Sequence, residues 1–212
     1  MPVVVSDQAT LTLHAVRLLG FADTASVASR FRQVVEEARE RLLDFEAVGW
    51  VSHSEFGTTS GWSMTASGRA EGQRRLASEL HRDDLRFVVA AMHRQFLILN
   101  ARFLEAATRW QVRTSPSSTM TPNDHNDLRW DSRVIEELGL LGGRLRPLNA
   151  EVAAVLTRFD GYADRYDVAF QKASRGENRW VTGVGIDSCH VVWMQLHEDL
   201  LATLGLERGQ EI

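Results

Sequence analysis

The stretch of sequence that decides the fold of the first third of the chain is WVSHSEFGTTSGWSMT, residues 50–65. Its two ends, residues 50–54 and 61–65, combine aromatic, β-branched and alternating polar residues in the way that predicts two strands. The Gly-Thr-Thr-Ser-Gly segment between them, residues 57–61, has the composition of a turn. This stretch therefore predicts a β-hairpin.

Three helical segments precede the predicted hairpin. An apolar segment over residues 11–19 ends at Gly20, a residue typical of helix ends. Asp23 and Thr24 offer an N-cap for a short second helix. A longer helix with one apolar face follows and ends at Gly49. The predicted order is three helices and then a hairpin.

Two short motifs flank the hairpin, VGWV at residues 48–51 and MTASGR at residues 64–69. They resemble the helix exit and the strand-to-helix junction of MarR-type and PadR-type regulators, over about residues 9–80. The resemblance implies an N-terminal winged helix-turn-helix domain, with the hairpin as its wing and Thr65 as the cap of the next helix. Met64 stands where the family usually has leucine. The resemblance also implies a homodimeric transcriptional regulator that binds double-stranded DNA.

The resemblance carries over a set of candidate DNA-binding residues. In the family, the start of the third helix enters the major groove, and basic side chains hold the phosphates. In this chain the corresponding helix start supplies Arg30, Arg32 and Gln33, and Arg39 lies further along the same predicted helix. The other two candidates are His53 in the wing and Arg69 at the junction after it.

The charge of this segment favours a second interpretation. Residues 1–82 carry nine Arg against ten Asp and Glu, and the whole chain has a formal net charge of −4. The wing has no Arg or Lys between Val51 and Ser67. Affinity for a duplex comes mainly from neutralising phosphates. The alternative is therefore a winged-helix module that contacts proteins and does not bind DNA.

The rest of the chain, residues 81–212, predicts a long helix followed by a C-terminal helical bundle. Residues 66–110 contain no proline, and apolar residues within them recur at alternating steps of four and three. Such a seam fits either the central helix of a bundle or a dimerisation helix, and both remain open. The seam consists of Leu85, Val89, Met92, Phe96, Leu99, Phe103, Ala106 and Trp110.

Further elements follow from helix stops and turn residues. Residues 114–127 predict a loop that is rich in turn residues. A helix over residues 130–141 is expected to end at Gly142-Gly143, with a restart at Pro147. Two more helices are expected over residues 162–173 and 186–204.

Aromatic and polar residues of this half are candidates for a ligand pocket. Aromatic rings interleaved with polar groups suit a small, partly apolar effector. The competing interpretation is an aromatic core. The candidate ligand-binding residues are Trp110, Trp130, Tyr162, Arg165, His190 and Trp193.

The sequence favours neither a metal site nor catalysis. Asp187, His190 and His197 have a spacing that metal ligands can use, but Asp187 also suits the first turn of a helix, and we expect no metal. Ser188, Cys189 and His190 are neighbours in sequence and would point apart on a helix. No motif of a hydrolase, a P-loop or a dinucleotide site is present. We therefore expect no enzyme and no cofactor.

Composition places the chain among soluble globular proteins. No apolar run approaches the ~20 residues that span a bilayer, and the N-terminus lacks the basic region of a secretory signal. The single cysteine excludes an internal disulfide. We expect a cytoplasmic protein that does not enter membranes.

Overall fold

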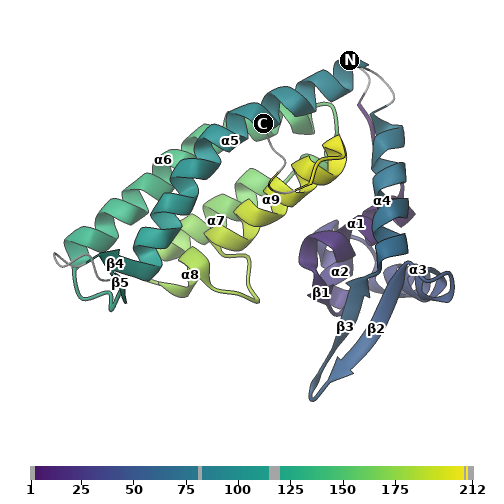
Figure 1. Cartoon of the computed structure of the whole chain (residues 1–212), viewed down its shortest axis with the longest axis horizontal. Coiled ribbons are helices and arrows are strands. Elements are labelled where there is room, and N and C mark those ends of the chain that lie inside the picture. The colour runs from purple at the N-terminus through teal and green to yellow at the C-terminus, as the bar shows by residue number, and fades with distance from the viewer. Residues whose placement is uncertain (1–2, 81–82, 115–119, 208, 210–212) are drawn as a thin grey trace. The chain divides into compact units, whose positions relative to one another are not determined.

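The computed structural model describes residues 3–80, 83–114, 120–207 and 209. These residues are mostly helical and include two small antiparallel sheets (Figure 1). None of the helices they form is both long and apolar enough to cross a membrane.

The chain divides into two compact units. Unit 1 comprises Met1–Val89, Val155–Arg158 and Glu198–Ile212, and unit 2 comprises Ala90–Ala154 and Phe159–His197. The sequence suggested a single division near residue 80. The first unit instead also takes in two later segments of the chain.

Unit 1 contains the helices and the hairpin that the sequence predicts. Asp7 and Asp23 cap the first two helices by accepting hydrogen bonds from the backbone N–H groups of Thr10 and Ser26. Gly20 ends the first helix with a φ of 76°, a conformation that glycine adopts without strain. The elements are α1 (Gln8–Leu19), β1 (Phe21–Ala22), α2 (Thr24–Arg30), α3 (Val35–Ala47), β2 (Val51–Phe56), β3 (Thr59–Met64) and α4 (Ala66–Glu79).

The sheet of unit 1 has the strand order β1-β3-β2, and all its pairs are antiparallel. In the hairpin, Val51 pairs with Met64 and Phe56 pairs with Thr59. One face of each of α1, α2 and α3 and one face of the sheet close over a common core. The buried core residues are Leu13, Ala15, Val16, Val27, Leu42, Phe45, Val51 and Trp62.

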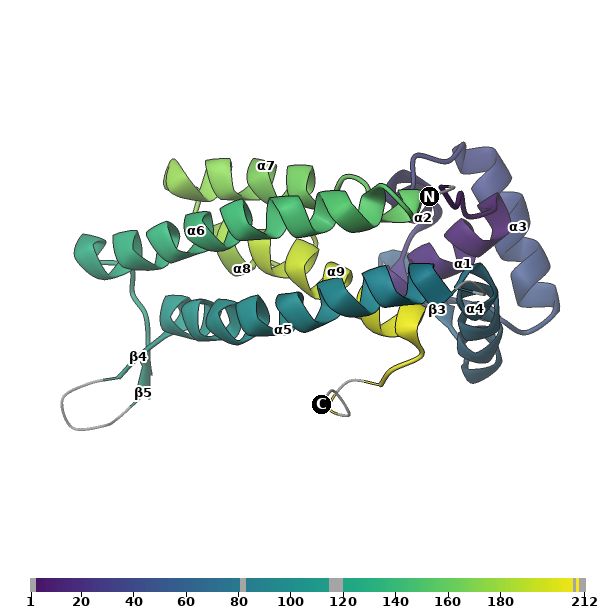
Figure 2. The ribbon, with the colours of Figure 1, turned by 90° about the horizontal axis from the view of Figure 1, so that it is seen from above.

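The second half of the chain is built from long helices, which Figure 2 shows running beside one another in unit 2. All eight residues of the predicted seam are at most 5% exposed within the single chain. The seam therefore belongs to the core, as expected for a bundle helix. The elements are α5 (Asp83–Gln111), β4 (Val112–Thr114), β5 (Met120–Pro122), α6 (Leu128–Ala153), the 3-10 helix η1 (Thr157–Phe159), α7 (Tyr162–Ser174), α8 (Arg179–Thr182) and α9 (Cys189–Leu204).

The predicted helix end at Gly142-Gly143 is wrong. α6 continues through both glycines and through Pro147. The physical reason lies in packing, because a Cβ at Gly142 would come within 2.7 Å of the Tyr166 ring, and one at Gly139 within 2.8 Å of the Phe170 ring. These glycines let α7 approach α6 closely.

Other boundaries also differ from the prediction. The proline-free stretch 66–110 forms two helices, with α4 ending at Glu79 and α5 beginning at Asp83. Strands β4 and β5 pair where the sequence predicts a loop, of which residues 115–119 lie outside the described part. The last helix begins at Cys189, three residues later than expected.

The junction between β3 and α4 is tightly packed in unit 1. The Thr65 side chain accepts a hydrogen bond from the Gly68 backbone N–H at 3.0 Å, which confirms the predicted cap. The same hydroxyl lies 2.6 Å from the carbonyl oxygen of Gly49. A Cβ at Gly68 would lie 1.9 Å from the carbonyl oxygen of Trp50. The motif of residues 64–69 thus fixes the start of α4 against the end of α3.

Gly68→Ala should destabilise the protein, because its methyl group has no room beside the Trp50 backbone. We expect the free energy of unfolding to fall by about 2 kcal/mol or more, as for other overpacked core sites. Gly72→Ala in the same helix is the matched control, since the nearest atom to its Cβ is Leu13 Cδ2 at 3.8 Å. There the higher helix propensity of alanine should leave stability unchanged or raise it by up to ~1 kcal/mol. Urea unfolding measures both, and equal effects would contradict this account.

Candidate functional site

The exposed surface of α3 and of the β2–β3 hairpin is the first candidate site, and we call it the α3 surface. Only Ala38, Leu42 and Phe45 of α3 are buried, so the rest of the helix faces outward. The hairpin lies next to α3 in the chain and projects from the helices of unit 1 (Figure 1). A helix with one free face and a neighbouring ribbon are elements that fit the grooves of a duplex.

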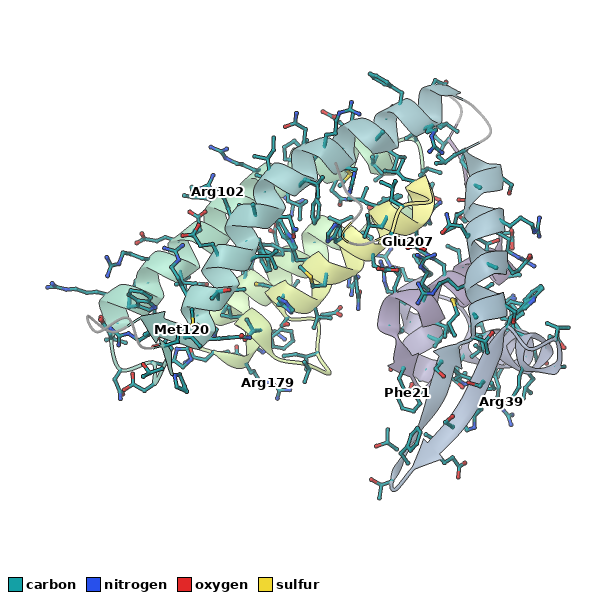
Figure 3. The ribbon with its side chains drawn as sticks, viewed as in Figure 1. Phe21, Arg39, Arg102, Met120, Arg179 and Glu207 are labelled. Atoms are coloured by element: carbon teal, nitrogen blue, oxygen red, sulfur yellow. The ribbon has the colours of Figure 1, made fainter. Side chains whose placement is uncertain are left out.

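Four of the predicted DNA-binding residues lie on the outside of unit 1. Arg32, Arg39, His53 and Arg69 are all exposed, and Figure 3 labels Arg39 on α3. The His53 ring lies 4.7 Å from the Trp62 ring, centroid to centroid. Arg69 Nη1 lies 3.7 Å from Glu198 Oε1 and keeps 59% of its side chain exposed.

The other two predicted residues face inward. The Gln33 amide donates to the carbonyl oxygen and the side chain of Gln8, and its oxygen accepts from the Thr12 hydroxyl at 3.0 Å. Arg30 is half-buried, and its guanidinium lies 4.5 Å above the Phe31 ring. Gln33 thus ties the turn between α2 and α3 to α1. The predicted start of the third helix is wrong, because Arg30 ends α2, Arg32 and Gln33 lie in the turn that follows, and α3 begins at Val35. The sequence could not separate the two inward-facing side chains from their exposed neighbours.

Acidic and apolar side chains also occupy the α3 surface. Glu37 is paired with Arg41 at 2.8 Å. At the hairpin, Phe56 is 69% exposed and its ring lies 6.0 Å from that of Phe21. The exposed acidic residues of α3 are Glu36, Glu37, Glu40, Asp44 and Glu46. This surface therefore offers few positive charges.

A buried ionic cluster is the second feature of unit 1. Asp199 of α9 is fully buried, and its Oδ1 lies 2.9 Å from Nε2 of His14 in α1 and 3.4 Å from Nε of Arg158. Arg158, 3% exposed, is also paired with Glu79 of α4 and donates to the Thr203 hydroxyl at 2.7 Å. Four segments that are distant in sequence are thus linked through Asp199 and Arg158.

The electrostatics of this cluster keep Asp199 ionised. Burial alone would raise the pKa of Asp199, but the His14 ring and the Arg158 guanidinium outweigh it and hold this pKa below its usual value. No sequence motif predicts this cluster, because its members are separated by long stretches of chain.

The predicted ligand-binding residues form core contacts in unit 2. Trp193 is fully buried, stacks on Phe103 at 4.4 Å between centroids, and donates from Nε1 to Asn100 Oδ1 at 2.9 Å. Tyr162 is also fully buried, and its hydroxyl donates to the carbonyl oxygen of Gln195 at 3.3 Å. These rings fill space instead of lining an open pocket.

The remaining candidates of this group have structural partners as well. Trp110 is 4% exposed and packs 4.4 Å from the His125 ring. Trp130 Nε1 donates to the carbonyl oxygen of Arg109 at 2.8 Å. A polar cluster that the sequence did not predict lies here, because Asp131 accepts from Asn123 and lies 2.9 Å from Nδ1 of His125.

The three metal-ligand candidates do not converge. Asp187 forms a bidentate ion pair with Arg165, in which Nε and Nη2 of the guanidinium donate to the two carboxylate oxygens at 2.8 and 2.7 Å. The His190 ring stacks near Phe103, and the His197 ring lies 5.2 Å from that of Phe96. Across the described ranges, no three His, Cys, Asp or Glu side chains gather as metal ligands would.

The Cys189 thiol has little reactivity of its own. Burial raises the pKa of Cys189 to about 12, so the thiol stays protonated at neutral pH. A thiol in this state is a poor nucleophile, whatever base lies beside it in sequence.

Comparison with models of known families, with curated proteins and with solved structures gives no match. Functional inference therefore depends on the geometry of the two units.

Asp199→Asn should lower the free energy of unfolding by about 3 kcal/mol at pH 7, because it leaves the buried Arg158 with less compensating charge. Asp44→Asn, the same change at an exposed position of α3, should stay within about 0.5 kcal/mol of the wild type. Urea unfolding followed by circular dichroism measures both variants.

The wild type and the Asp199→Asn variant can also be compared as a function of pH. The folded protein holds the pKa of Asp199 below the ~3.9 expected for an unfolded chain. Its contribution is therefore complete above about pH 4 and is lost as the pH falls toward the folded pKa. The stability gap between the wild type and Asp199→Asn should narrow below pH 4, and a gap that widens there would contradict the assignment.

Proposed function

We propose that unit 1 is a winged helix-turn-helix domain and that the protein is a transcriptional regulator that binds double-stranded DNA as a homodimer. The observation that carries the proposal is the arrangement of α2, α3 and the hairpin. α2 packs across α3, α3 buries only three residues, and the hairpin extends beside it. In such domains the second of the two helices lies in the major groove.

The exposed arginines of unit 1 supply the phosphate contacts in this proposal. Arg32 lies in the turn between α2 and α3, Arg39 lies on α3, and Arg69 lies in the first turn of α4. The three side chains are exposed and come from three different elements of unit 1. Three contacts per protomer are few for a DNA-binding protein, which agrees with the acidic residues of the α3 surface.

This small number of cations makes the proposal quantitative. With three phosphate contacts per protomer, a dimer should show a slope of about −5 in the plot of log affinity against log salt concentration. We would measure the anisotropy of a labelled duplex from upstream of the protein's own coding sequence, against a scrambled duplex. Preference for the upstream duplex with this shallow slope is the expected result.

Arg39→Ala should weaken binding at least tenfold and reduce the salt slope by about 2 in the dimer, since each copy loses one phosphate contact. Arg179→Ala, which removes an exposed arginine from α8 of unit 2, is the matched control and should change neither quantity. Equal effects of the two variants would contradict a reading surface on α3.

A second function is favoured by the apolar side chains of the same surface. Leu43, Val48 and Phe56 are 47%, 59% and 69% exposed. Each has an exposed acidic residue within two positions of it in the sequence, namely Asp44, Glu46 and Glu55. Apolar groups with an acidic rim fit a basic protein partner better than a duplex. Absence of duplex binding at low salt would favour this interaction module.

A further inference from the structure

The long helix α5 has a second seam on the face opposite to its buried one. Each residue of this seam follows a buried seam residue by two positions, which is a rotation of about 200° around the helix. Arg94, Ile98, Ala101, Glu105 and Thr108 are exposed and Ala91 is half-buried. Their steps of three and four residues are those of a coiled-coil contact. Unit 2 thus leaves a regular helix-packing face uncovered.

The apolar centre of this face is large enough to matter. Ile98 is 63% exposed, and Leu104 beside the seam is 44% exposed. On α6, Leu140 is 61% exposed. Arg102, which Figure 3 labels on α5, is paired with Glu137 of α6 at 2.8 Å. Exposed apolar groups in such a row are typical of contact surfaces.

The charges of the seam are arranged symmetrically about its centre. Arg94 and Glu105 lie equally far on either side of the midpoint between Ile98 and Ala101. Ala91 and Thr108 form an outer pair around the same midpoint, and both are small. In the part of the chain that the structure describes, neither Arg94 nor Glu105 has an ion-pair partner. When two copies of this seam run in opposite directions, each Arg94 therefore lies opposite a Glu105, and each Ala91 lies opposite a Thr108.

We propose that this face binds the same face of a second copy of the chain, with the two α5 helices antiparallel around a two-fold axis. Such an interface is isologous, so each contact occurs twice. Arg94 of each copy then meets the partner's Glu105, and Ile98 packs against the partner's Ala101. A parallel pair would instead place Arg94 against Arg94 and Glu105 against Glu105, which charge repulsion disfavours.

The inference rests on the homodimer of the proposed function and assigns its interface. The seam from Ala91 to Thr108 is roughly 26 Å long at the rise of an α-helix. A single helix pair of this length buries less than the ~800 Å² per partner of a standard interface. We therefore expect a dimer that dissociates at micromolar concentration.

A charge-swap experiment tests the interface. Sedimentation velocity without DNA, from about 1 to 100 µM protein, should show a concentration-dependent dimer for the wild type. Arg94→Glu and Glu105→Arg each create two like-charge contacts and should raise the dissociation constant at least tenfold. The double variant restores both pairs in reversed order and should return the constant to within about threefold of the wild type. Arg179→Glu, with the same charge change on α8, should have no effect.

Three results would overturn the interface. These are a wild type that remains monomeric at 100 µM, a double variant that stays as weak as the single ones, and a control that dissociates the dimer equally. Because DNA is absent, failure of duplex binding leaves this outcome unaffected. If the wild type dimerises and the charge-swap variants behave as expected, but the protein does not bind the upstream duplex, only the DNA proposal is rejected.

Discussion

The ionised Asp199 carboxylate is the interaction on which the architecture of unit 1 depends. It joins α9 to His14 of α1 and to Arg158, which in turn reaches Glu79 of α4. Buried charges cost several kcal/mol each when they are unpaired, so every member requires the others. Unit 1 is therefore complete only when the end of α9 that carries Asp199 has packed into it. This constraint makes a domain boundary near residue 80 insufficient to describe a folding unit.

The first helices and the hairpin were predictable because their ends are set locally. Asp23 caps α2, Gly20 ends α1 and Thr65 caps α4, and each acts on backbone within a few residues. The course of α6 was not predictable from local signals. Gly142 serves the approach of Tyr166 instead of a helix end, and only the tertiary partner reveals which role a glycine has.

The candidate site divides in the same way. The sequence placed basic and polar residues near the start of the third helix. It could not show that the Gln33 side chain forms hydrogen bonds with Gln8 and Thr12, whereas Arg39 is exposed. Among the aromatic residues, periodicity could not distinguish a pocket from a core, and Trp193 is core. The two seams of α5 share one periodicity, and only burial within the chain shows which of them is exposed.

The indole groups of the tryptophans give a direct test of the proposed duplex binding. The chain has six tryptophans, of which Trp50 and Trp62 lie in unit 1, and Trp62 donates from Nε1 to the Thr24 hydroxyl beside the hairpin. We would titrate protein labelled with ¹⁵N-tryptophan with the upstream duplex and follow the six indole N–H signals by NMR. A reading surface on α3 and the hairpin predicts that the signals of Trp50 and Trp62 shift first and furthest. Shifts confined to Trp110, Trp130, Trp180 and Trp193 of unit 2 would contradict it.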